Sequence, residues 1–190
     1  KPVRVWGIDL GTTNSTISEI NWSPDREPCS YPECRCLELE QPTSEGVFTS
    51  PIVPSVVAVL PSGETWVGEG AKRLRTRPQQ ASLTTEKNLF FETKNEMGLR
   101  KTYYRASENF NSAWKIGGHI LAFLMQEAQK LNGTTADRVV VTVPASFQLN
   151  QRRDTLLAAQ KAGISLGEYD LLDEPTAALI DYLMSHSTEN

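Results

Sequence analysis

Several features that would define a class of protein are missing from this sequence. No apolar run approaches the roughly 18 residues that a membrane-spanning helix needs, and no signal peptide opens the chain. The net charge of −4 indicates no surface for a polyanion. We therefore expect neither a membrane nor nucleic acid as a partner, and a cytoplasmic location.

Cysteine is also scarce, with only Cys29, Cys34 and Cys36, all in one proline-containing stretch. Their odd number and the missing signal peptide argue against a disulfide framework. A three-thiolate metal site is an alternative, but zinc usually takes a fourth ligand and paired C-x-x-C spacing. We favour reduced thiols in an ordinary loop, without a structural metal.

Hairpins dominate the first part of the 190 residues. Short apolar or alternating runs bounded by glycine, proline and serine predict strands, and EGAKRLR before Pro78 predicts a short helix. The expected strands are 3–10, 15–20, 36–39, 56–60 and 65–67. Periodicity is weak over 79–111, where we expect loops with a short strand or two.

Strands and helices alternate in the later part. Residues 113–131 repeat apolar positions at helical spacing and stop at Asn132-Gly133. A strand over 138–143 precedes a helix that Asn150 caps and that reaches Ala162. A strand over 170–173 leads to a last helix, which Pro175 opens. Early hairpins followed by alternation predict an α/β fold with a mixed sheet covered by helices.

The segment GIDLGTTNS contains the first candidate site. Gly11 lets the backbone approach a ligand closely, and Thr12, Thr13 and Asn14 supply hydrogen-bond donors for phosphate. Asp9 would repel phosphate directly, so its expected partner is a divalent cation held through water. This is not a Walker loop, which requires a lysine and a following helix. The alternative is a tight turn whose hydroxyls bond their own backbone.

Three stretches in this order carry a family resemblance: IDLGTTNS, VVVTVPASFQLNQRRDTLLAAQKAG and LLDEPTAALIDYL. Together they closely resemble the nucleotide-binding domain of the heat-shock protein 70 (DnaK-like) chaperone family, within the actin and sugar-kinase superfamily. PSVVAVLPSGETWVGEGAKR matches the same family. The resemblance implies a ribonuclease-H-like (actin-like ATPase) lobe with a mixed sheet flanked by helices. It also implies a core subdomain of about 1–50 and 113–190, with a reduced second subdomain inserted over about 51–112.

The resemblance implies roles for individual residues. Asp9 orients hydrated magnesium, while Gly11, Thr12, Thr13 and Asn14 form the first phosphate loop, with Thr13 also counted as catalytic.

Two further side chains complete the implied catalytic set. Lys94, with Gly98 at the family's spacing, would stabilise charge on the γ-phosphoryl oxygens. Its alternatives are a solvated lysine or Lys87 in its place, and Asn95 stands where the family has arginine. Glu174 would position the metal or the attacking water, or else serve only as a favourable carboxylate at a helix N-terminus.

Pro144 and Arg152 match the proline and arginine that relay nucleotide state to the peptide-binding part of the chaperone. An exposed helix arginine is the alternative for Arg152.

The sequence lacks the family's second, glycine-rich phosphate loop, its adenosine motif and its peptide-binding domain. The chain is therefore expected to be one lobe of a two-lobed ATPase, inactive alone because phosphoryl transfer needs positioning from both sides. The full-length protein is expected to be a stress-response chaperone that uses ATP/ADP and Mg²⁺, with unfolded peptide clients and co-chaperones. Two alternatives remain: a non-enzymatic nucleotide-binding scaffold, and a sugar-kinase-type phosphotransferase.

Overall fold

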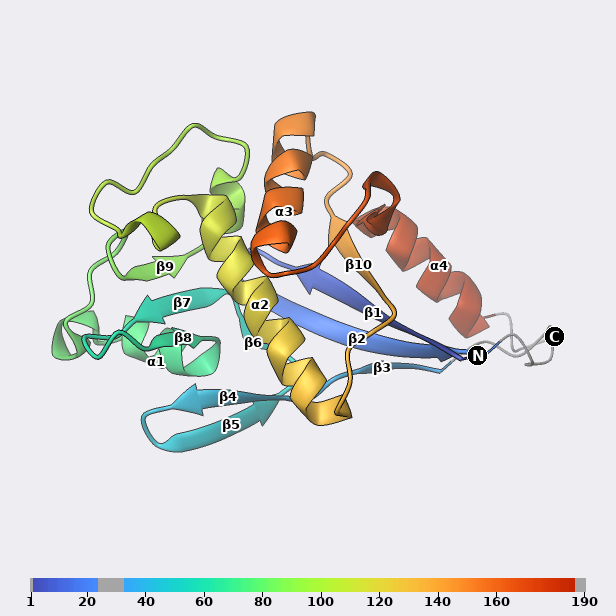
Figure 1. Cartoon of the computed structure of the whole chain (residues 1–190), viewed down its shortest axis with the longest axis horizontal. Coiled ribbons are helices and arrows are strands. Elements are labelled where there is room, and N and C mark those ends of the chain that lie inside the picture. The colour runs from blue at the N-terminus through green and yellow to red at the C-terminus, as the bar shows by residue number, and fades with distance from the viewer. Residues whose placement is uncertain (1, 24–32, 187–190) are drawn as a thin grey trace.

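The main sheet carries the candidate site at one of its edges. The computed structural model describes residues 2–23 and 33–186 and has a mixed α/β architecture (Figure 1). Strand order in the main sheet is β11-β10-β1-β2-β3, and β6 also pairs with β2. The strands are β1 (Val3–Leu10), β2 (Asn14–Trp22), β3 (Cys34–Cys36), β6 (Val53–Pro54), β10 (Arg138–Val143) and β11 (Leu171–Asp173).

Strand direction explains where this sheet presents its loops. β1 and β2 form an antiparallel hairpin, closed by the Leu10↔Ser15 pair. β10 runs parallel to β1, and β11 runs parallel to β10. The carboxyl ends of β1, β10 and β11 therefore lie at the same edge, which is where open α/β sheets bind their ligands.

In the sequence, the strands of two smaller sheets and several short helices come between β3 and the long helix α2. β4 (Leu39–Thr43) pairs with β5 (Gly46–Ser50), and β7 (Val56–Val59) lies between β8 (Thr65–Val67) and β9 (Leu89–Phe91). Helix α1 (Glu69–Arg75) follows β8. Single 3₁₀ turns occupy η1 (Pro78–Ala81), η2 (Thr93–Glu96), η3 (Glu108–Phe110) and η4 (Glu168–Asp170).

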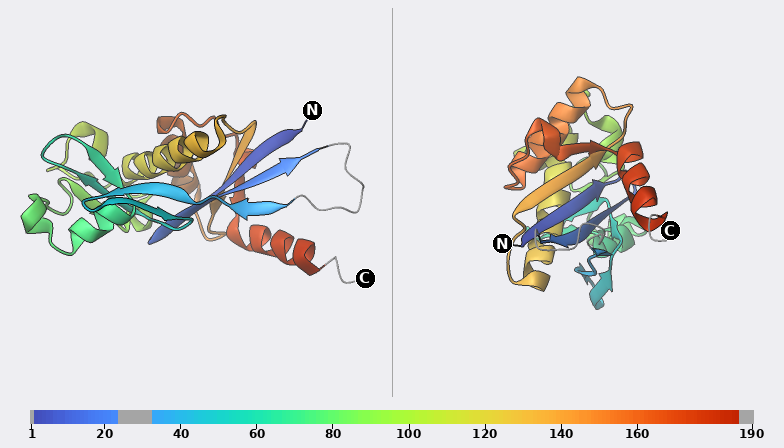
Figure 2. Two further views of the ribbon diagram at one scale, coloured as in Figure 1. Left: turned by 90° about the horizontal axis from the view of Figure 1, so that it is seen from below. Right: turned by 90° about the vertical axis from the view of Figure 1, so that its right-hand side faces the viewer.

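Three longer helices cover the main sheet. α2 (Ala113–Asn132) and α3 (Leu149–Lys161) pack together on one face, and α4 (Glu174–His186) lies on the opposite face (Figure 2). As predicted, α2 ends at Asn132, because Gly133 takes a left-handed φ of 70° and its N–H bonds the Gln129 carbonyl. No helix in the described ranges is both long and apolar enough to span a bilayer.

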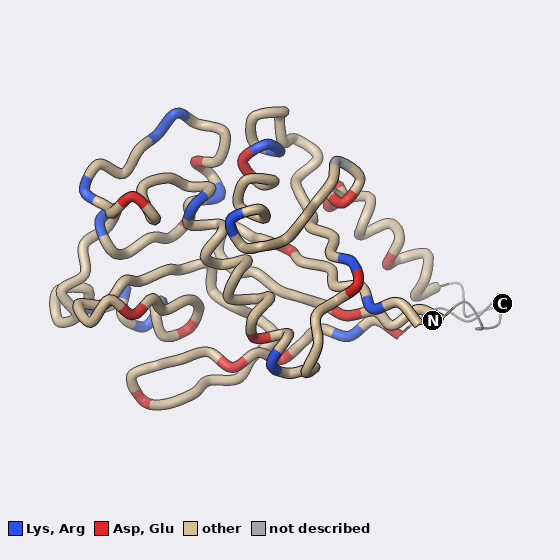
Figure 3. The backbone as a smooth tube through the Cα atoms, viewed as in Figure 1, with Lys and Arg blue, Asp and Glu red and all other residues tan. Residues whose placement is uncertain are grey.

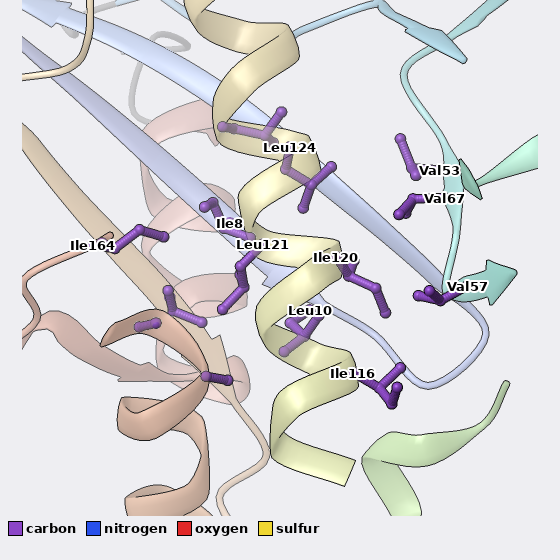
Figure 4. Close-up of a cluster of buried hydrophobic side chains, with 14 of the residues drawn as sticks. Ile8, Leu10, Val53, Val57, Val67, Ile116, Ile120, Leu121, Leu124 and Ile164 are labelled. Atoms are coloured by element: carbon purple, nitrogen blue, oxygen red, sulfur yellow. The ribbon is translucent and has the colours of Figure 1, made fainter. Parts of the chain in front are cut away.

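The core forms where α2 crosses β1 (Figure 4). Ile116, Ile120 and Leu121 of α2 are almost completely buried, as are Ile8 and Leu10 of β1. Val53, Val57 and Val67 belong to the same cluster, so α2 also packs against the strands that follow β5. Basic and acidic residues both occur along the described chain (Figure 3).

The strand predicted over 36–39 is wrong. β3 ends at Cys36, and Leu39 begins β4, which pairs with β5 through the Thr43↔Gly46 turn. At that turn Gly46 takes a φ of 121°, which favours glycine.

The helix cap predicted at Asn150 is also wrong. α3 begins at Leu149, so its N-cap position is Gln148, whose N–H donates to Gln151 Oε1 at 2.9 Å. Asn150 lies within the helix: its Oδ1 accepts from the Gln151 N–H at 3.1 Å, and its Nδ2 donates to the distant Gly98 carbonyl at 2.7 Å.

The cysteine prediction is tested only in part, because Cys29 lies outside the described residues. Cys34 and Cys36 are free thiols on the exposed strand β3. Within 2–23 and 33–186, no group of three His, Cys, Asp or Glu residues is placed to hold a metal ion. The absence of a metal from the whole three-cysteine segment stays a prediction.

The buried carboxylate of Glu19 links β2 to both of its neighbours, β1 and β3, through hydrogen bonds. Glu19 of β2 has only 1% of its side chain exposed, and it accepts hydrogen bonds from Trp6 Nε1 at 3.0 Å and from Arg35 of β3 at 2.9 Å. Arg4 lies 3.3 Å away. Burial raises the pKa of Glu19, but the hydrogen bonds from Trp6, Arg35 and Asn21 and the charge of Arg4 outweigh it, so the pKa lies below its usual value.

Glu19→Gln should destabilise the chain by about 2 kcal/mol at pH 7, the size of a hydrogen bond to a charged group. The pKa of Glu19 is lower in the folded than in the unfolded chain. Its carboxylate therefore makes its full contribution to the free energy of unfolding above the unfolded-state pKa of roughly 4.3, and this contribution is lost as the pH falls through the folded-state pKa. Urea unfolding at several pH values should therefore show that the free energies of unfolding of the wild-type protein and of Glu19→Gln become equal in acid. Glu64→Gln is the control, since Glu64 accepts from Trp66 Nε1 at an exposed site. A difference that stays constant into acid would contradict this account.

Candidate functional site

A pocket of about 460 Å³ opens at the carboxyl ends of the three parallel strands. Each strand delivers a segment to it: β1 is followed by the loop at Gly11, β10 by Pro144, and β11 by Glu174. A fourth segment, η2, approaches from outside the main sheet. The lining residues are Asp9, Gly11, Thr12, Lys94, Asn95, Pro144, Ser146, Phe147, Gln151 and Glu174.

The loop between β1 and β2 is held by Ser55. The Ser55 hydroxyl donates to the Gly11 carbonyl at 2.7 Å and lies 2.9 Å from the Ser15 hydroxyl, while the Ser55 N–H donates to the Thr13 carbonyl at 2.8 Å. Because Ser55 donates its only hydroxyl hydrogen to Gly11, Ser15 is the donor between the two hydroxyls. The Gly11 and Thr13 carbonyls thus both accept hydrogen bonds from Ser55. These bonds fix the loop without using its N–H groups.

Gly11 is required by the shape of this loop. A Cβ added at Gly11 would lie 2.0 Å from the Asn14 carbonyl oxygen, far inside van der Waals contact. The glycine predicted to let a ligand approach therefore first lets the loop close on itself.

Asp9 stands at the end of β1 beside Thr142 of β10, its partner in the parallel register. The Thr142 hydroxyl lies 3.3 Å from Asp9 Oδ1 and 3.4 Å from the Ile8 carbonyl. Asp9 is otherwise exposed, so its carboxylate keeps free coordination sites facing the pocket.

Lys94 reaches across the pocket from η2. Its Nζ lies 3.1 Å from Glu174 Oε1 and 5.5 Å from the centre of the Phe147 ring, and its side chain is only 10% exposed. Lys87 is exposed on the turn before β9 and does not line this pocket. Of the two lysines considered from the sequence, Lys94 is the one that the fold brings to the other candidates.

Glu174 is the first residue of α4, directly after β11, and its side chain is 42% exposed. The preceding Asp173 accepts a hydrogen bond from Arg152 of α3, and Arg152 Nε also points to the Phe147 carbonyl at 3.4 Å. Arg152 is thus paired rather than free on the helix surface, while Pro144 lines the pocket.

Thr13 follows Gly11 and Thr12 in the loop and Asn14 begins β2, but both side chains are exposed and neither lines the pocket. Asp9, Thr12, Glu174 and Lys94 thus converge as predicted, and Thr13 does not join them.

Sequence reasoning did not single out four other residues, Ser55, Ser146, Phe147 and Gln151, and it noted Asn95 only as a departure from the family. For Ser146 and Phe147 a signal was available, since they directly follow a strand that is parallel to β1. Ser55, a small polar residue before an apolar strand, gives no local sign of its long-range bond.

The charged groups of the pocket fit a metal–phosphate ligand. Asp9 and Glu174 are acidic and Lys94 is basic. Mg²⁺ is usually bound through one or two carboxylates together with substrate phosphates and waters, rather than by an all-protein cage. Two carboxylates beside an ammonium group and a loop of N–H and hydroxyl donors satisfy that requirement.

Fold and site together define a mixed α/β protein with a polar pocket of about 460 Å³ beyond the carboxyl ends of its parallel strands. Residues 45–190 match the family model described as Hsp70 protein. The chain is 35% identical over 179 residues to the chaperone protein DnaK of Mesomycoplasma hyopneumoniae strain 232, covering 94% of this chain and 25% of the relative. It is 31% identical over 195 residues to the chaperone protein HscA homolog of Ralstonia pickettii strain 12J, covering 96% and 28%.

The chain belongs to the Hsp70 family, as the family match and these identities show. A third relative, the chaperone protein dnaK of Gracilaria tenuistipitata var. liui, is 30% identical over 195 residues, with 94% of this chain and 28% of the relative covered. The chain spans about a quarter of the length of the relatives it matches.

Proposed function

We propose that this chain is part of the ATP-binding and ATP-hydrolysing module of an Hsp70-like chaperone, and that the pocket at Asp9, Lys94 and Glu174 holds the phosphates. The observation that carries the proposal is the convergence of four separate segments, carrying opposite charges, on one pocket beside the Gly11–Thr12 loop. Its fold would be the ribonuclease-H-like lobe of actin-like ATPases, with a core subdomain over about 1–50 and 113–190 and a smaller one over about 51–112.

Each residue has a distinct task in this proposal. Backbone N–H groups and hydroxyls of the loop, from Gly11 through Thr13 and Asn14, bind phosphate oxygens. Asp9 orients magnesium through water, and the bound metal supplies charge neutralisation on the phosphates. Thr13 and Asn14 would have to turn inward, since both side chains are exposed.

Lys94 and Glu174 would exchange partners when nucleotide binds. Their ion pair at 3.1 Å keeps an ammonium group of low exposure satisfied in the absence of phosphate. A γ-phosphoryl group would take over the ammonium, because a doubly charged oxyanion group offers it a stronger partner than one carboxylate. Glu174, released from Lys94, would then orient the attacking water.

Pro144 and Arg152 are proposed to pass the state of the pocket to the rest of the protein. The contact of Arg152 with Asp173, next to Glu174, supports this role because a shift of Glu174 would move that pair. Peptide clients, co-chaperones, a stress-response role and a cytoplasmic location follow from the same proposal.

The test is steady-state ATP hydrolysis by the full-length protein, with nucleotide binding measured by calorimetry. Slow, magnesium-dependent turnover is expected. The chain of 190 residues alone should bind ATP–magnesium weakly and show no turnover, because every 1.4 kcal/mol of missing contacts costs tenfold in affinity. Binding without hydrolysis in the full-length protein would favour the scaffold alternative, and tight binding by the short chain would mean that the site is elsewhere.

A further inference from the structure

The segment that follows Lys94 is fastened to α3 by two side chains. The Gly98 N–H donates to Asp154 Oδ2 at 2.7 Å, and Asn150 Nδ2 donates to the Gly98 carbonyl at 2.7 Å. Asn150 and Asp154 are four residues apart on α3 and therefore lie on the same face of the helix. Both polar backbone groups of one residue are thus bound by side chains more than 50 positions away in the sequence.

Only glycine allows this close approach. Gly98 has a φ of 80°, and a Cβ there would lie 2.7 Å from Gln151 Cγ and 2.9 Å from Asn150 Nδ2. The backbone leaving η2 therefore lies directly against the first turns of α3.

The residues on either side of Lys94 are also fixed by the core. Met97 is 2% exposed, and a Cβ on Gly117 of α2 would lie 2.6 Å from Met97 Cε. Thr93, directly before Lys94, is also buried. Because the residues on both sides of Lys94 are held in place, the Lys94 backbone has a fixed position from which the side chain contacts Glu174.

The same two turns of α3 also contact the opposite wall of the pocket. Arg152, between Asn150 and Asp154, binds Asp173, whose neighbour is Glu174. α3 thus holds the Gly98 backbone near Lys94 through Asn150 and Asp154, and the Asp173 side chain next to Glu174 through Arg152.

We propose that Asn150 and Asp154 are positioning residues that set the location of Lys94 relative to Glu174 by clamping Gly98 on α3. The inference rests on the proposed function, in which Lys94 acts on the transferred phosphoryl group. Neither side chain lines the pocket, so both act through the backbone of the lysine segment.

The experiment compares Asp154→Ala with Asp154→Asn in the full-length protein. The alanine variant has no acceptor for the Gly98 N–H, whereas the asparagine variant keeps an amide oxygen there. We expect Asp154→Ala to lower kcat for ATP hydrolysis at least tenfold with KM changed less than threefold, because a misplaced group costs chemistry more than binding. Asp154→Asn should keep at least half of the wild-type kcat. Ile164→Val, a core variant remote from the clamp, controls for a general loss of stability.

A second measurement needs no activity. The acetylation rate of Lys94 by an amine reagent, followed by mass spectrometry, reports whether its ammonium group is still held in the pocket. The rate should rise severalfold in Asp154→Ala and stay at the wild-type value in Asp154→Asn and Ile164→Val. If the wild-type protein hydrolyses no ATP, the proposed function fails while this labelling still decides the positioning. Wild-type labelling of Lys94 in Asp154→Ala, or equal losses in both Asp154 variants, would overturn the inference.

Discussion

Lys94→Ala should lower ATP turnover by the full-length protein at least a hundredfold while leaving it folded. The low exposure of the side chain makes its charge effective, since little water screens it. Removing one preorganised donor to a developing oxyanion typically costs a factor of 10²–10³ in rate. Hydrolysis assays, with circular dichroism to check the fold, measure both parts of this expectation.

The matched control is Lys87→Ala, which removes an exposed lysine from the turn before β9. It should retain wild-type turnover, because Lys87 does not line the pocket. Full activity in Lys94→Ala would instead assign Lys94 a surface role. Loss of activity in Lys87→Ala would mean that the wrong lysine has been placed at the site.

Gly11→Ala should abolish measurable nucleotide binding by the full-length protein and destabilise it. The new Cβ would lie 2.0 Å from the Asn14 carbonyl oxygen, and the obstacle is backbone rather than a flexible side chain. The loop must open, which breaks the bonds of Ser55 to Gly11 and Thr13 and disperses the phosphate-binding groups. Overpacking of this kind costs typically 1–3 kcal/mol. Calorimetry with ATP–magnesium and urea unfolding report the two effects.

Gly167→Ala serves as the control for this substitution. Gly167 has an ordinary φ of −91°, and a Cβ there would meet only Asp170 Oδ2, at 3.6 Å. It should leave both stability and nucleotide binding close to wild type. Wild-type binding by Gly11→Ala would show that the Gly11–Thr13 loop does not hold the phosphates.

The strands that bring the site together could be predicted from the sequence, because each has its own local pattern of apolar residues. The apolar runs of β1 and β10 and the helical period of α2 reflect burial, which repeats along each element. The order of hairpins and later alternation was enough to expect a mixed sheet. The β4–β5 hairpin was missed, because β5 is largely exposed and its sequence lacks a clear alternation.

The anchoring contacts around the pocket could not be predicted in the same way. Ser55, Asn150 and Asp154 act through single hydrogen bonds to loop backbone far away in the sequence, and such bonds leave no periodic signal. Asn150 was assigned a local helix cap, since that is the usual use of asparagine before a helix. Lys94 itself was identified only through the family resemblance, in which Gly98 keeps the family's spacing to the lysine, and the contact of Gly98 with α3 gives a physical reason for that glycine.

The most direct test of the central claim is a crystal structure of the full-length protein with a slowly hydrolysed ATP analogue and Mg²⁺. The account predicts phosphate oxygens within hydrogen-bonding distance of the Gly11–Thr13 backbone and of Lys94 Nζ, with Asp9 facing the metal through water. Phosphates bound elsewhere, with the Lys94–Glu174 ion pair still intact at 3.1 Å, would contradict it.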